Sequence, residues 1–170
     1  MNNLQFKLYT PFDQLTSIQM DRVTDFLYEH LQEYGDKRAH IKKALNYAMK
    51  AEPHNGGFVL VCSNSEKILG TVVINQTGME GYVPENILVY IAVHQDTRGK
   101  GVGKQLMKKA IKCCTGDIAL HVEPDNPALF LYQKLGFENK YLEMRLKKGD
   151  VSYDTVPPSE EGQQPSANLN

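Results

Sequence analysis

The chain has 170 residues, of which 41% are hydrophobic and 23% charged, a composition typical of a globular protein with room for one substantial core. Its 19 lysines and arginines nearly balance its 20 acidic residues, which excludes a protein that binds nucleic acid or membranes through bulk charge. Three cysteines, an N-terminus without a leader pattern and only short apolar runs predict a cytoplasmic protein without disulfides.

The first half of the chain reads as a strand, two helices and a hairpin. Periodicity and turn residues predict a strand at residues 6–9, helices over 18–34 and 36–49, and strands over 57–62 and 68–75. We expect Asp36 to cap the second helix, because its carboxylate can accept from the first free amides. Gly70 interrupts its strand and is a candidate bulge.

The second half alternates strands with helices. Residues 86–93 are apolar at nearly every position, as expected for a central strand covered on both faces. Beyond it the pattern predicts a helix over 103–114, a strand over 117–123, a helix over 127–135 and final strands within 137–147. Asn126 is the expected N-cap of the second of these helices, with Pro127 at its first position.

Residues 149–170 differ in composition from the rest of the chain. They contain four acidic residues, three prolines and no lysine or arginine, which leaves residues 1–148 with a net charge of +3. Such a segment buries too little apolar surface to offset the entropy of ordering it. The sequence therefore predicts one domain over residues 1–148 and a mobile extension over 149–170.

A glycine-rich turn directly follows the predicted central strand, and it leads into a helix. The turn comprises Arg98, Gly99, Lys100, Gly101, Val102, Gly103 and Lys104. A turn of this kind presents bare N–H groups and a positive helix end to an anion. Neither the P-loop nor the dinucleotide fingerprint matches its spacing. Because cations and no acids occupy residues 98–112, a ligand with several phosphates fits the site.

The spacing Arg-x-x-Gly-x-Gly, at Arg98, Gly101 and Gly103, resembles the pyrophosphate loop of the GNAT superfamily of acyl-CoA-dependent N-acyltransferases. A second block resembles that family's other signature, an asparagine followed by Leu-Tyr-x-Lys-x-Gly-Phe; here these are Asn126 and residues 131–137. The family commonly has seven positions from the asparagine to the tyrosine, and this chain has six.

The resemblance implies a fold and a reaction. The fold is the acyl-CoA N-acyltransferase α/β (mixed α+β) fold, with a mixed, mostly antiparallel sheet of about six or seven strands and about four helices. The reaction is attack by a primary amine of an unidentified acceptor on the thioester of acetyl-CoA, with no metal. The alternative is a non-catalytic acyl-CoA-binding module. The resemblance also leaves open whether the protein forms a homodimer.

The resemblance also implies cofactor contacts. In the family, the strand before the glycine loop has a bulge, splays away from the next strand and offers main-chain groups to the pantetheine. By position this falls at residues 91–93, with Val93 as the bonding residue. The implied contacts to acetyl-CoA are Ile91, Ala92, Val93, Asn126, Tyr132 and the loop residues 98–104.

Three side chains are candidates for acid or base catalysis. By resemblance, Tyr132 protonates the leaving thiolate, although its place on the apolar face of a helix also suits a core tyrosine. His121 is a candidate base, because imidazoles act near neutral pH, but a histidine on a strand also suits a structural role. Glu85, at the start of the central strand, is the rival base and would act through water.

Overall fold

The computed structural model describes residues 4–50 and 55–149, and every structural statement below concerns these residues. They fall into two compact units, Met1–Glu138 and Asn139–Asn170. All described helices and strands belong to the first unit. Most of the predicted extension, residues 150–170, lies outside the described residues.

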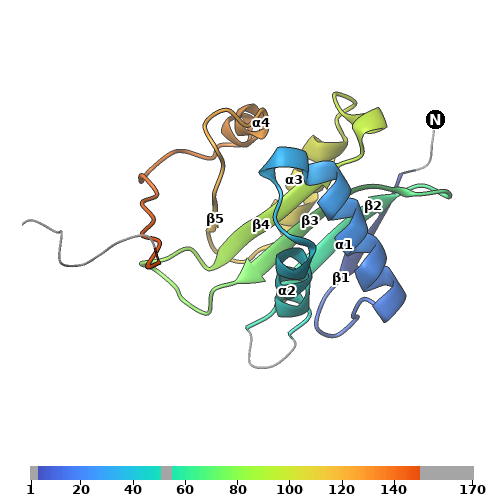
Figure 1. The fold of residues 1–170 in the computed structure, drawn as a ribbon, viewed down its shortest axis with the longest axis horizontal. Coiled ribbons are helices and arrows are strands. Elements are labelled where there is room, and N and C mark those ends of the chain that lie inside the picture. Colours follow the sequence, from blue (N-terminus) through green and yellow to red (C-terminus); the bar gives the residue numbers. More distant parts are fainter. Residues whose placement is uncertain (1–3, 51–54, 150–170) are drawn as a thin grey trace, which may run out of the picture. The chain divides into compact units, whose positions relative to one another are not determined.

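A mixed sheet of five described strands forms the centre of the first unit, in the order β1-β2-β3-β4-β5 (Figure 1). Its strands are β1 (Gln5–Tyr9), β2 (Gly57–Ser63), β3 (Ile68–Gln76), β4 (Asn86–Val93) and β5 (Ile118–Leu120). The first four pair antiparallel in sequence order, and β5 runs parallel to β4. The mixed, mostly antiparallel sheet implied by the resemblance is thus confirmed.

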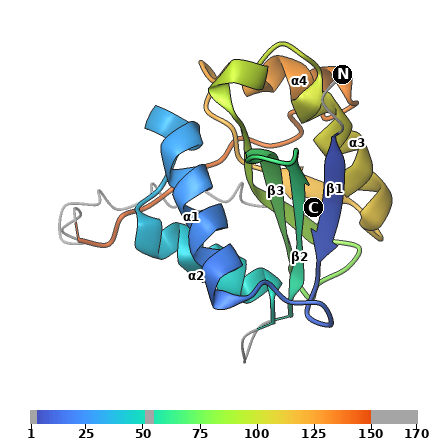
Figure 2. The ribbon, with the colours of Figure 1, turned by 90° about the vertical axis from the view of Figure 1, so that its right-hand side faces the viewer.

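Four helices cover the two faces of this sheet (Figure 2). They are α1 (Ser17–Leu31), α2 (Arg38–Ala48), α3 (Val102–Cys113) and α4 (Ala128–Lys134). One core lies under α1 and α2, where Leu27, Ile41 and Leu45 are fully buried. The other lies under α3 and α4, around Leu106 and Met107. Each such side chain contributes about 1.5–3 kcal/mol by leaving water.

Two helix starts follow from their cap residues. Thr16 accepts a hydrogen bond from the Gln19 amide, and the Gln19 side chain accepts one from the Thr16 amide, so α1 begins with a capping box. Asn126 Oδ1 accepts from the Ala128 amide at 2.9 Å, and Pro127 already has helical angles. The N-cap residue of α4 is thus Pro127, one position after the predicted Asn126, although the Asn126 side chain accepts from the first helical amide as a cap does.

Several sequence-based expectations on the fold are wrong. Asp36 does not cap α2, whose N-cap residue is Lys37 without a side-chain bond; the Asp36 carboxylate bonds Tyr90 instead. The strand predicted over 117–123 is only β5, Ile118–Leu120, because its pairing with β4 ends there.

No strand forms in residues 137–147, so the described sheet has five strands rather than six or seven. Leu142, Met144 and Leu146 alternate with charged residues as a strand would, yet 62–91% of each is exposed. A strand needs a partner on its hydrogen-bonding edge, and alternation alone does not supply one.

No helix in the described ranges has the length and apolar character needed to cross a membrane.

Candidate functional site

Strand β4 has a bulge in its middle. In its ladder with β3, Tyr90 pairs with Val73 and Leu88 pairs with Ile74, so Val89 is an extra residue. Residues 91–93 pair with β3 in regular register, and the placement of the bulge there is wrong by two positions. Because a bulge bends a strand and increases its twist, the direction of β4 changes at Val89.

The pairing of β4 with β5 ends just before this bulge. Its last pair joins Leu88 to Leu120, and no described strand pairs with the same edge of β4 beyond that point. The main-chain groups of residues 89–93 that point away from β3 are therefore open on the side where β5 would continue. An extended ligand can bond such an edge as an added strand does.

The glycine loop lies at the end of β4 that carries this open edge. Gly99 and Gly101 have φ of 73° and 82°, in the left-handed region that glycine favours. A Cβ at either position would have no protein atom within 4 Å, so the surface above them is open. At Gly103, in contrast, a Cβ would lie 3.3 Å from Val93 Cγ2, so glycine lets α3 start close to β4.

The amides at the start of α3 have no acceptor within the described part of the chain. The first helical bond from the loop runs from the Gln105 amide to the Gly101 carbonyl, which leaves the amides of Val102, Gly103 and Lys104 unbonded. The partial positive charge at this end of α3 favours an anion. Lys100 and Lys104 are exposed beside these amides. The structure therefore has the glycine turn and the free amides that the sequence predicted, and their binding of an anion stays a prediction.

Arg98 has a side-chain arrangement that the sequence did not predict. Its guanidinium donates to the His30 carbonyl at 2.9 Å and to Gln32 Oε1 at 3.3 Å, both at the C-terminal end of α1. Its Nε also faces the Val93 carbonyl, at 3.5 Å. The guanidinium thus bonds protein atoms that lie outside the loop.

Tyr132 lies on α4 with its ring in the core and is 6% exposed. Burial raises the pKa of its phenol to about 12, so the hydroxyl is protonated at neutral pH. The hydroxyl has no hydrogen-bond partner among the described residues. Every fully buried side-chain oxygen of the described residues has a hydrogen-bond partner. Because the Tyr132 hydroxyl has none, it is not fully buried and must reach accessible surface. It can therefore donate a proton to a ligand.

The two candidate bases differ in how they are held. His121 is exposed and directly follows Leu120, the last residue that pairs with β4. Its main chain therefore stands beside the bulge. Glu85 instead accepts from the Asp117 amide at 2.6 Å and the Gly81 amide at 3.4 Å. These bonds, the one from Asp117 foremost, hold the pKa of Glu85 below its usual value, which weakens it as a base.

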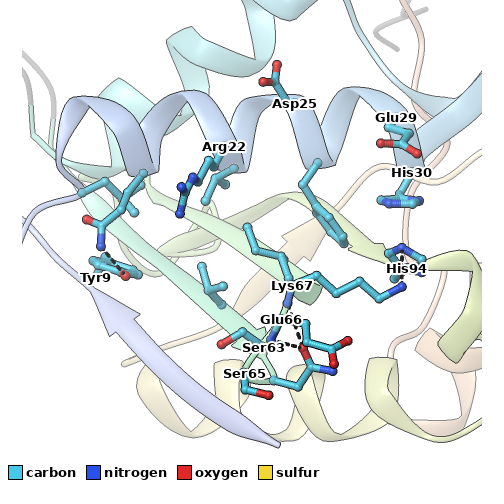
Figure 3. Close-up of a pocket in the computed structure, with 17 residues that line it drawn as sticks. Tyr9, Arg22, Asp25, Glu29, His30, Ser63, Ser65, Glu66, Lys67 and His94 are labelled. Carbon is cyan, nitrogen blue, oxygen red and sulfur yellow. Dashed lines mark hydrogen bonds between the residues drawn. The ribbon is translucent and has the colours of Figure 1, made fainter.

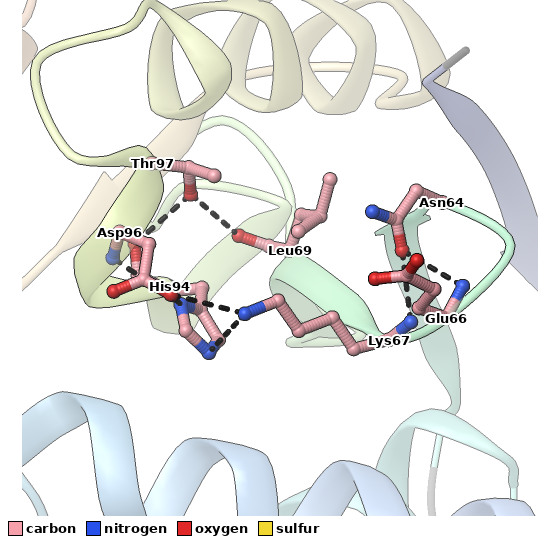
Figure 4. A network of polar contacts seen from close by, with 7 residues as sticks. All are labelled: Asn64, Glu66, Lys67, Leu69, His94, Asp96 and Thr97. Atoms are coloured by element: carbon pink, nitrogen blue, oxygen red, sulfur yellow. Dashed lines mark hydrogen bonds and ion pairs between the residues drawn. The ribbon is translucent and has the colours of Figure 1, made fainter. Parts of the chain in front are cut away.

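A cavity of about 630 Å³ lies between α1 and the turn that joins β2 to β3 (Figure 3). None of the predicted site residues lines it. At one end the His30 and His94 rings are 4.6 Å apart (Figure 3). Next to them Lys67 Nζ bonds the Asp96 carboxylate at 3.0 Å (Figure 4). Sequence reasoning missed this cavity because its lining comes from separate segments without a shared motif.

Comparison with known proteins identifies the family of the chain. Residues 17–137 match the acetyltransferase (GNAT) family. Mouse and human proteins named cysteine-rich protein 2-binding protein are each 37% identical to the chain over 57 residues. That stretch covers 33% of this chain and only 7% of the length of these relatives.

Solved structures resemble the chain over a longer span. The aminoglycoside N-acetyltransferase AAC(6')-Iy in complex with CoA has a TM-score of 0.62 at 15% identity, covering 86% of this chain and 95% of that one. The ribosomal-protein-alanine N-acetyltransferase from Brucella melitensis biovar Abortus 2308 has a TM-score of 0.56 at 17% identity, covering 85% and 99%. At such identities the likeness establishes a shared fold.

Proposed function

Because the chain belongs to the acetyltransferase (GNAT) family and has its α+β fold, we propose that it transfers the acetyl group of acetyl-CoA to a primary amine. The proposal assigns residues 1–148 to the transferase domain. The observation that carries it is the continuity of two features: the free amides at the start of α3 and the open edge of β4 beyond Leu88.

Each feature suits one part of acetyl-CoA. The amides of Val102, Gly103 and Lys104 hold the diphosphate, where the open surface above Gly99 and Gly101 admits it. The pantetheine extends along β4 past Val93, Ala92 and Ile91, and bonds those of their main-chain groups that point away from β3. The thioester then reaches the bulge at Val89.

The reaction needs three groups from the protein: a base for the amine, a donor for the oxyanion and a proton donor for the thiolate. An amine of pKa about 10 is mostly charged at pH 7, so its deprotonation costs about 4 kcal/mol. His121 is the candidate base, since it stands next to the bulge and Glu85 is held by the turn before β5. A main-chain N–H near the bulge stabilises the developing oxyanion. The Tyr132 hydroxyl supplies the proton that the departing thiolate takes up.

Calorimetry with the full chain tests the binding half of this proposal. We expect acetyl-CoA and CoA to bind, and acetyl-pantetheine, which lacks the diphosphate and nucleotide, to bind at least about tenfold more weakly. Equal affinity for acetyl-CoA and acetyl-pantetheine would exclude the glycine loop as the diphosphate site. No binding of acetyl-CoA would refute the proposal as a whole.

Release of free CoA thiol tests the transfer half. The full chain is incubated with acetyl-CoA and a panel of peptide N-termini, lysine peptides, polyamines and amino sugars. A transferase releases thiol faster with at least one amine than without any. Tight binding of acetyl-CoA without amine-dependent release across the panel would instead favour the non-catalytic acyl-CoA-binding module.

A further inference from the structure

The arginine of the glycine loop joins two layers of the fold. Arg98 stands before α3, which covers one face of the sheet, whereas its acceptors His30 and Gln32 stand at the end of α1, which covers the other. Between them the side chain passes the end of β4, where Nε faces the Val93 carbonyl. Three of the side chain's N–H groups therefore point at protein acceptors.

The end of α1 is a site where a cation is favoured. The last carbonyls of a helix lack helical partners, and the helix dipole makes this end partly negative. Gln32, which follows α1, has φ of 54° and ψ of −131°, a conformation that residues with a side chain rarely adopt. Such a conformation persists only where its surroundings hold it, and the bond from Arg98 to Gln32 Oε1 does so.

The same turn also touches the segment before α4. The Tyr34 hydroxyl donates to the Asp125 carbonyl at 3.3 Å. Residues 30–35 are thus bonded to the loop before α3 through Arg98 and to the loop before α4 through Tyr34. The first of those loops belongs to the proposed acetyl-CoA site, and the second leads into α4, which carries Tyr132.

We propose that Arg98 is a positioning residue, which fastens residues 30–35, the last residues of α1 and the turn after it, to the glycine loop. Its guanidinium then does not bind the diphosphate, in contrast to the contact implied by the resemblance. Main-chain amides and Lys104 hold the diphosphate, and a loop fixed by its ligand fixes the turn after α1 as well. The statement on the diphosphate rests on the proposed function. The attachment of residues 30–35 to the glycine loop by Arg98, in contrast, can be measured without any ligand.

Hydrogen exchange of the free full chain tests the fastening. Arg98→Met removes the charge, and Arg98→Lys keeps it but cannot reach all three acceptors at once. We expect the amides of residues 30–35 to exchange about tenfold faster in both variants. Lys112→Met, which removes a charge from the far end of α3, away from the loop, is the control and should leave them unchanged. Unchanged exchange in both Arg98 variants would overturn the proposal.

Calorimetry with CoA at about 50 and 200 mM NaCl separates positioning from phosphate binding. We expect both Arg98 variants to bind CoA within about threefold of the original chain and with the same salt dependence, whereas Lys104→Met weakens binding and flattens that dependence. A loss of affinity in Arg98→Met that Arg98→Lys restores would identify a diphosphate ligand and overturn the proposal. If the original chain binds no CoA, the proposed function fails, and hydrogen exchange still decides the role of Arg98.

A matched pair at Gln32 tests the contact from its other side. Gln32→Glu keeps an acceptor for Arg98, and Gln32→Met has a similar shape without one. We expect exchange of residues 30–35 to rise about threefold in the methionine variant and to stay near the original rate in the glutamate variant. Combining Gln32→Met with Arg98→Met should add little to Arg98→Met alone, because both remove one contact. Full additivity would contradict a shared contact.

Discussion

The Tyr90 hydroxyl donates a hydrogen bond of 2.6 Å to the Asp36 carboxylate, 54 positions earlier in the chain. Tyr90 directly follows the bulge residue Val89, and Asp36 lies in the turn between α1 and α2. Burial and the neighbouring carboxylate raise the pKa of the Tyr90 phenol well above its usual value, so the donor stays protonated. The contact ties the turn that precedes α2 to the strand that is expected to hold the thioester.

Replacing Tyr90 by phenylalanine removes this bond and leaves the ring in place. We expect the free energy of unfolding to fall by about 1 kcal/mol, the usual value of one hydrogen bond when the exposed carboxylate can return to water. Urea unfolding measures the change, with Tyr82→Phe, at a residue that is 81% exposed, as the control. A loss below about 0.3 kcal/mol would show that the bond does not stabilise the fold.

The two glycines Gly101 and Gly81 form a matched pair for testing the loop. Their φ values are 82° and 79°, and a Cβ at either would meet no protein atom within 4 Å. Alanine at either position should therefore lower the free energy of unfolding by a similar amount, about 1–2 kcal/mol. Only Gly101→Ala should also weaken CoA binding, since its Cβ projects over the proposed diphosphate site. An equal effect of both variants on CoA affinity, measured by calorimetry, would contradict that site.

The elements that sequence reasoning located are those set by local patterns. The helices and the first four strands follow from apolar periodicity and turn residues, and the glycine loop follows from its own spacing. Gly70 shows where local reasoning fails. It was expected to form a bulge, but the extra residue is its neighbour Leu69, and a Cβ at Gly70 would lie 2.6 Å from Leu106 Cδ1. The glycine lets α3 pack closely, a need that its own strand does not reveal.

The same distinction applies to the candidate site. The open amides of the loop are a local property, and the sequence predicted them. Arg98 bonds residues 66 and 68 positions away, and Glu85 bonds an amide 32 positions away. No spacing rule connects such partners, because their proximity depends on how the strands and helices pack. Roles for Arg98 and Glu85 that rest on motif or position alone therefore missed what their side chains bond.

Glu85→Gln distinguishes a structural carboxylate from a catalytic one. The carboxylate accepts from the Asp117 and Gly81 amides, so the glutamine variant should unfold at a lower temperature at pH 7. Because the pKa in the folded state lies below its ordinary value of 4.5, this stabilisation is complete above pH 4.5 and is lost as the pH falls through the folded-state value. The difference in Tm between the two proteins should therefore shrink on acidification.

The same variant also tests Glu85 as the general base. We expect Glu85→Gln to keep turnover within about threefold of the original chain, whereas loss of a general base typically lowers it by about 10²–10⁴-fold. His121→Gln should show the larger loss, and thiol release with the best amine of the panel measures both. A large loss in Glu85→Gln at unchanged Tm would reverse the assignment of the base.

Tyr132→Phe isolates the proton that the departing thiolate takes up. Because the ring is 6% exposed while its hydroxyl has no partner among the described residues, the variant should keep the fold's stability within about 0.5 kcal/mol. Acetyl-CoA affinity should also stay near the original value, since the loop amides and β4 are untouched. Turnover should fall by about 10²-fold or more, because the thiolate then leaves without a proton donor. Unchanged turnover at unchanged affinity would make Tyr132 a core residue whose hydroxyl takes no part in the transfer.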